Sequence, residues 1–110
     1  MAVLLTKPWT TIDAAALDAV PGQLGVYELA DADHRVLFVG RADARSLFGL
    51  KGEIARDVRA VPEARAFRYE VTSAYHTRHL ELLMAHASGA GLPPVNVARG
   101  LPALGRLRPG

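Results

Sequence analysis

The sequence predicts an α+β domain with a small three-stranded antiparallel sheet flanked by helices. Two β-rich runs are separated by a polar turn, a third run alternates apolar and polar residues, and apolar residues recur at helical spacing on either side of that third run. The 110 residues, 50% of them hydrophobic, suffice for one buried core but not for two. We therefore expect a single domain over residues 1–110.

Residues 24–30 and 35–42 are expected to form a β-hairpin. Both runs are rich in β-branched and aromatic residues, and the connecting segment 31–34 reads Asp-Ala-Asp-His, which favours a turn. The hairpin should form the first two strands of the sheet.

Two glycines mark the far ends of this hairpin. With a turn near residue 33, Gly25 and Gly40 would lie roughly opposite each other. The gap between them, beside the rings of Tyr27 and Phe38, would let another backbone or a phosphodiester approach closely.

The first 23 residues are expected to be a helical extension that packs on the hairpin. Residues 10–13 read Thr-Thr-Ile-Asp, which resembles a capping box, and a helix from there should end near Val20, before Pro21-Gly22. Nothing in this segment suggests chemistry.

A helix over 46–60 and a strand over 66–73 should follow the hairpin. In the strand Phe67, Tyr69 and Val71 alternate with Arg68, Glu70 and Thr72. The second set would form a solvent-facing side of the sheet, where Arg68 is available to a phosphate but more commonly pairs with an acid.

The last long helix is expected over residues 77–88. An apolar stripe at helical spacing consists of Leu80, Leu83, Met84 and Ala87. Glu81 would lie about 110° from the centre of that stripe, at the border between core and solvent. A carboxylate there could reach into a cleft.

The order of these features resembles the GIY-YIG nuclease superfamily. The two name-giving motifs correspond to Gly25-Val26-Tyr27 and Phe38-Val39-Gly40. The remaining features, in order, are Arg41, the helix 46–60, the strand 66–73, Glu81 in its helix, and Pro93-Pro94-Val95-Asn96. The resemblance covers residues 24–96, followed by a basic tail over 97–110.

The resemblance implies a metal-dependent endonuclease that hydrolyses phosphodiester bonds in DNA. Glu81 would bind one Mg²⁺ or Mn²⁺ together with the substrate phosphate, Tyr27 would lie where the attacking water is activated, and Asn96 would order the cleft. The expected catalytic residues are Tyr27, Phe38, Arg41, Lys51, Glu81 and Asn96, and the expected nucleic-acid contacts are Arg41, Arg45, Lys51, Arg68 and His76.

Two departures from the family pattern affect this expectation. Phe38 replaces the second motif's tyrosine, and Phe48 occupies the position where the family has an arginine. Arg45 and Lys51, one helical turn to either side of Phe48, are the candidate replacements. Because of the lost hydroxyl and the displaced cation, two alternatives stay open beside the favoured active nuclease: a catalytically weak or inactive module that binds nucleic acid, or a structural or protein-interaction domain.

The amino-acid composition excludes some classes of chemistry. No cysteine is present, which excludes thiolate chemistry and cysteine-based zinc sites. Eleven of the 13 cationic side chains are arginine, the residue best suited to phosphate. No apolar run is long enough to span a membrane, so we expect a soluble, cytoplasmic protein.

The partners follow from the same residues. DNA is expected rather than RNA. A chain with so little outside the core would need a targeting partner protein, would select DNA by structure, or would be weakly selective. A zinc site on His76, His79 and His86 is disfavoured because their spacing misses the His-Glu-x-x-His pattern. The sequence does not predict the oligomeric state.

Overall fold

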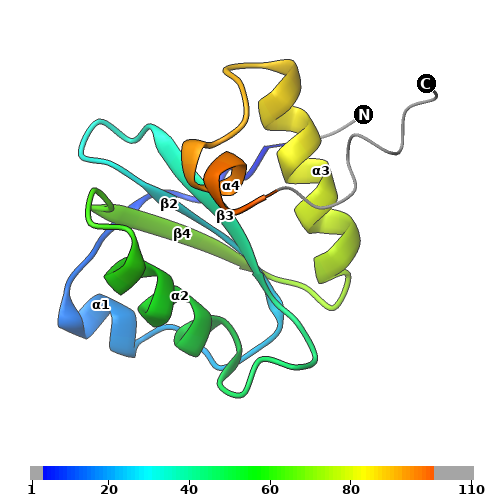
Figure 1. Ribbon diagram of the computed structural model, residues 1–110. Coiled ribbons are helices and arrows are strands. Elements are labelled where there is room, and N and C mark those ends of the chain that lie inside the picture. The colour runs from blue at the N-terminus through cyan, green and yellow to red at the C-terminus, as the bar shows by residue number, and fades with distance from the viewer. Residues whose placement is uncertain (1–3, 101–110) are drawn as a thin grey trace.

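The computed structural model describes residues 4–100 and confirms the α+β class, with a four-stranded antiparallel sheet in place of the expected three strands (Figure 1). The elements are β1 (Thr10–Thr11), α1 (Ala14–Asp18), β2 (Gly25–Ala30), β3 (Val36–Ala42), α2 (Gly49–Ala60), β4 (Ala66–Val71), α3 (Tyr75–Ser88) and α4 (Pro94–Arg99). The strand order is β1-β4-β2-β3, so β3 is a free edge.

The additional strand comes from the segment expected to be a capping box. Thr10 pairs with Phe67 and Thr11 with Ala66, as suits β-branched residues beside an open sheet edge. Asp13 caps α1 instead, because its Oδ1 accepts a hydrogen bond from the backbone N of Ala16 at 2.7 Å. The N-terminal segment is therefore a strand plus a one-turn helix.

The hairpin of β2 and β3 is confirmed, but its register differs from the expectation. Gly25 pairs with Ala42, and Gly40 pairs with Tyr27. The two glycines are not opposed, since the register of the hairpin shifts between Leu29 and Ala30. A Cβ at Gly40 would overlap the Tyr27 ring, so this glycine makes room for the tyrosine rather than for a ligand backbone.

Helices cover both faces of the sheet. Figure 1 shows α1 and α2 on one face and α3 on the other. One core consists of residues such as Leu29, Ile54 and Phe67, and a second, smaller core includes Val26 and Leu83. The expectation of a solvent-facing side of the sheet is therefore wrong. Helix α3 covers that side, so both faces of the sheet are buried.

The buried stripe of α3 is rotated from the predicted one. Its buried residues are His79, Leu82, Leu83 and His86, whereas Met84 is 47% exposed and Ala87 is exposed. Two histidines occupy core positions because each finds a hydrogen-bond partner there. Apolar periodicity alone could not reveal them.

The short helix α4 covers the free edge of β3. Asn96 Oδ1 accepts a hydrogen bond from the backbone N of Val39 at 2.8 Å, and Asn96 Nδ2 donates to the Val39 carbonyl at 2.9 Å. The amide thus replaces a missing neighbouring strand. No helix among residues 4–100 is long and apolar enough to span a bilayer, and Arg106 and Arg108 of the expected basic tail lie outside the described residues.

Candidate functional site

A cavity of about 400 Å³ lies where β3, α2 and α4 meet. Its charged wall consists of Arg41, Asp43, Arg45, Glu53, Arg56, Asp57 and Arg99, and its uncharged wall includes Tyr27, Phe38, Ser46, His79 and Asn96. Of the residues expected at the site, Tyr27, Phe38, Arg41, Arg45 and Asn96 therefore come together here.

A buried tyrosine–carboxylate pair forms the floor of the cavity. Tyr27 on β2 donates its hydroxyl hydrogen to Oδ2 of Asp57 on α2, and both residues are 1% exposed. Burial, together with the Asp57 charge, raises the pKa of Tyr27 well above its ordinary value. The Tyr27 hydroxyl is therefore neutral at physiological pH and donates its hydrogen bond to Asp57.

Asp57 is also bound by two cations. Arg99 Nη1 lies 3.0 Å from Asp57 Oδ1, and Arg56 Nε lies 3.6 Å from the same oxygen. Arg56 also pairs with Glu53, whose Oε2 accepts a hydrogen bond from Ser46 Oγ at 2.8 Å. The acids of this wall are thus already neutralised by guanidinium groups.

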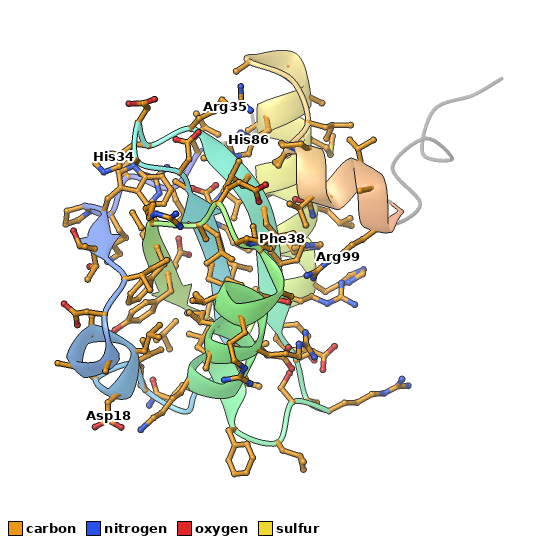
Figure 2. All side chains as sticks on the ribbon, turned by 60° about the vertical axis from the view of Figure 1, so that its left-hand side comes forward. Asp18, His34, Arg35, Phe38, His86 and Arg99 are labelled. Atoms are coloured by element: carbon orange, nitrogen blue, oxygen red, sulfur yellow. The ribbon has the colours of Figure 1, made fainter. Side chains whose placement is uncertain are left out.

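The last turn of α4 closes one side of the cavity. Figure 2 shows Arg99 beside Phe38, and the Arg99 guanidinium carbon is 4.6 Å from the Phe38 ring centroid. The Phe38 ring in turn packs edge-on against Tyr27, with centroids 6.0 Å apart. Because Asn96 fixes α4 on β3, it also positions Arg99 over the floor.

Two further arginines, Arg41 and Arg45, lie on the rim of the cavity. Arg41 Nη1 donates to His76 Nδ1 at 3.1 Å, and its Nε lies 3.7 Å from Asp43 Oδ2. The Arg45 side chain is exposed and has no hydrogen-bond or ion-pair partner among residues 4–100. With four arginines and three carboxylates on the described wall, Arg45 supplies the unbalanced positive charge.

His79 projects into the wall from α3. Its Nε2 lies 3.2 Å from the Val39 carbonyl, which requires a proton on that nitrogen. Its Nδ1 is buried without a hydrogen-bond partner in the described part of the chain. Burial lowers the pKa of His79, with the nearby Arg41 charge adding to this effect, so the ring is neutral at physiological pH.

Two expected nucleic-acid contacts lie elsewhere. Lys51 pairs with Asp18 of α1 at 3.0 Å. Arg68 makes two 2.8 Å contacts, from Nε and Nη2, to Glu28 Oε1. Neither lines the cavity, because Lys51 points toward α1 and Arg68 points toward the face of the sheet that α3 covers.

Glu81 does not face the cavity either. Its Oε1 lies 3.5 Å from Arg78 Nη1, its side chain is 46% exposed, and Arg78 also contacts Glu70 at the end of β4. His79, two residues earlier on α3, contacts β3 instead, so successive faces of α3 separate the two side chains.

A single Mg²⁺ on Glu81 therefore does not fit a phosphate bound in this cavity. The carboxylates that do line the cavity are paired with arginines, as described above. Among residues 4–100 no three histidines, aspartates or glutamates gather into a metal-binding group. The arrangement suits an anion better than a divalent cation.

The residues that sequence reasoning missed are Glu53, Arg56, Asp57, His79 and Arg99. One signal for Asp57 was present: Leu50, Ile54 and Asp57 are the spaced positions that α2 buries, and a carboxylate on a buried stripe requires a specific partner. Arg99 was expected only as part of the basic tail over 97–110, since its position over the cavity depends on how α4 packs.

Comparison with known families adds one assignment. The model of a domain of unknown function, DUF7508, matches residues 3–89, which include every helix and strand from β1 to α3. No curated protein matches the chain. Because the match extends over more than half of the residues, the chain belongs to the DUF7508 family.

Proposed function

We propose that this chain is a GIY-YIG-type domain that binds the sugar-phosphate backbone of nucleic acid in the cavity between β3, α2 and α4. The order of elements supports this proposal: a hairpin with Tyr27 and Gly40 is followed by a helix, a third main strand, a helix and the asparagine of α4. DNA is the expected nucleic acid on the strength of that resemblance.

The observation that carries the proposal is the pairing state of the charges. The acids in the wall are paired with Arg41, Arg56 and Arg99, while Arg45 is exposed and has no partner within residues 4–100. A phosphate entering the cavity would meet Arg45 first and could share Arg41 and Arg99 with their present partners. Guanidinium groups bind phosphate through paired N–H donors.

Hydrolysis of the bound phosphodiester is a second candidate, favoured by the Tyr27–Asp57 hydrogen bond. A water attacking the phosphorus would pass its proton to the Tyr27 oxygen, while Tyr27 passes its own proton to Asp57. The bond from phosphorus to the leaving sugar oxygen would break, and that oxygen would take a proton from solvent water. Asp57 is then the proton acceptor, which overcomes the difficulty of using a tyrosine of raised pKa as a base. This scheme is independent of Glu81.

Fluorescence anisotropy with labelled single-stranded, duplex and branched DNA, and RNA of the same sequence, tests the first proposal. Arg45→Ala should weaken binding about fivefold to tenfold, by the loss of one charge-assisted contact. Arg59→Ala is the matched control because Arg59 is exposed at the far end of α2 and does not line the cavity. Equal effects of the two variants would contradict the proposal.

Incubation of the same substrates with Mg²⁺, Mn²⁺ or chelator tests the second candidate. Cleavage that Tyr27→Phe and Asp57→Asn abolish and Glu81→Ala preserves would establish the Tyr27–Asp57 scheme. Metal-dependent cleavage that Glu81→Ala abolishes would instead support the metal-bound nuclease implied by the resemblance. Binding without cleavage by the unaltered protein would leave the nucleic-acid-binding module as its function.

A further inference from the structure

Two large apolar side chains are held in solvent just outside the cavity. Leu47 is 90% exposed and Phe48 is 70% exposed. They are adjacent in the chain and precede α2 directly. Single exposed apolar residues are ordinary on protein surfaces, but an adjacent pair with so little burial favours a role in binding.

The loop that carries this pair has a defined internal structure. The backbone N of Asp43 donates to Ser46 Oγ at 3.1 Å, the backbone N of Arg45 donates to Asp43 Oδ1 at 2.9 Å, and Ser46 Oγ donates to Glu53 Oε2 at 2.8 Å. These bonds tie the loop to itself and to α2. Phe48 is thus exposed on an ordered loop.

Glycines fix the direction of Phe48. Gly49 has φ of +59°, and a Cβ there would overlap the backbone of Gly22 and Gln23. The backbone N of Leu50 donates to the Gln23 carbonyl at 2.8 Å. A Cβ at Gly52 would lie 2.8 Å from the Phe48 Cβ. The close fit at Gly49 fixes the start of α2, and the absence of a side chain at Gly52 leaves room for Phe48 beside that helix.

The same loop supplies part of the cavity wall. Arg45 and Ser46 line the cavity, and Phe48 follows within two residues of Ser46. Three residues of chain span at most about 10 Å, so the Cα atoms of Arg45 and Phe48 lie within that distance of each other. A cation at the wall followed by an exposed aromatic ring is the combination that proteins use to bind single-stranded nucleic acid.

We propose, on the basis of the nucleic-acid binding argued above, that Phe48 stacks on an unpaired base of the strand whose phosphate contacts Arg45. The bases of a continuous duplex already stack on each other and offer no free face. The domain therefore selects single-stranded or unpaired nucleic acid over continuous duplex. The apolar ring recognises the base face without reading its sequence.

Anisotropy titrations of the full chain with a fluorescein-labelled dT10 oligonucleotide and a duplex of equal length test this inference. Phe48→Ala and Phe48→Leu should each weaken dT10 binding by roughly 5- to 150-fold, the range for loss of one base stack. Phe48→Trp should retain binding, and duplex binding should stay unchanged in all three. Met84→Ala, which removes an exposed apolar side chain on α3, is the control.

The outcomes separate this inference from the proposed function. If the unaltered protein binds dT10 but Phe48→Ala binds it equally well, the stacking inference is wrong and the binding function stands. Wild-type affinity in Phe48→Leu would also overturn stacking, because any apolar side chain would then suffice, as expected of a protein-docking surface. If the unaltered protein binds neither probe, the proposed function fails and the inference fails with it.

Discussion

Two buried carboxylates, Glu28 and Asp57, lie on opposite faces of the sheet. Both are bound by basic side chains, but the exposure of those side chains to solvent differs. Glu28 is fully buried and is bound by Arg68 and by His86, whose Nε2 lies 2.8 Å from Glu28 Oε2. Asp57 is 1% exposed and is bound by Tyr27, Arg99 and Arg56. The Arg68 and His86 side chains are 14% and 10% exposed, whereas those of Arg99 and Arg56 are 39% and 62% exposed.

On the proposed function, this difference distinguishes a structural charge cluster around Glu28 from a binding site around Asp57. Around Glu28 both the acid and its partners are nearly desolvated, so exchanging a partner for a ligand would leave a buried charge unpaired. Around Asp57 the acid is buried but its cations reach into a cavity. Those cations can turn toward an incoming phosphate while remaining partly solvated.

Removing the Glu28 carboxylate should give the largest loss of stability. Glu28→Ala leaves Arg68 and His86 without their buried anion, and the free energy of unfolding should fall by about 3–5 kcal/mol. Urea denaturation measures this change. The control Glu70→Ala, which removes a half-buried acid from β4, should cost less than about 1 kcal/mol. Comparable losses would show that Glu28 is not a structural centre.

Neutralising Asp57 should lower stability but strengthen ligand binding. Asp57→Asn keeps the shape, and we expect the free energy of unfolding to fall by about 1–3 kcal/mol. Arg99 and Arg56 lose their anion, so dT10 affinity should rise by about threefold to tenfold. Glu28→Gln, the equivalent change on the other face, should leave affinity unaltered. Weaker binding by Asp57→Asn would contradict the exchange of partners.

The raised pKa of Tyr27 should make stability fall at alkaline pH. An unfolded tyrosine loses its proton near pH 10, while the buried Tyr27 keeps it to higher pH. Between those values the folded state binds more protons, so stability should decline by up to about 1.4 kcal/mol per pH unit above pH 10. Tyr27→Phe should reduce this slope in urea titrations at pH 9 to 11. An unchanged slope would show that Tyr27 ionises freely.

The smallest expected effect comes from His79 at acid pH. Burial holds its pKa below the ordinary 6.5, so below that pH the unfolded state binds the additional proton and stability falls as pH falls. The loss between pH 7.5 and 5.5 should be about 1 kcal/mol. His79→Gln should lessen it, as measured by urea midpoints at the two pH values. An equal loss of stability in the unaltered protein and in His79→Gln would show that His79 is not the source of the loss.

The sequence predicted the parts of this molecule that depend on local pattern. The hairpin, α2, β4 and α3 follow from alternation, turn residues and helical spacing. The strand β1 could not be predicted, because two threonines form a strand only when an open edge is beside them. The rotation of α3 was missed because His79 and His86 are buried through single hydrogen bonds that periodicity does not register.

The same distinction between local pattern and tertiary packing applies to the residues of the site. Tyr27, Phe38, Arg41 and Asn96 were predicted to lie together because the motif order fixes their strands and helices. Glu81 and Lys51 do not line the cavity, and the sequence could not show this because a rotation of less than one helical turn moves a side chain to another face. Asp57 and Arg99 meet from α2 and α4, which are far apart in sequence, so their contact arises from tertiary packing.

The salt dependence of dT10 binding tests the central claim most directly. If Arg45 neutralises a backbone phosphate, Arg45→Ala should reduce the slope of log K against log salt by about 0.7, the value for one contact to a single strand. Arg59→Ala, at the far end of α2 and away from the cavity, should leave the slope unchanged. An equal change in both variants, or a change in neither, would contradict phosphate binding at the cavity.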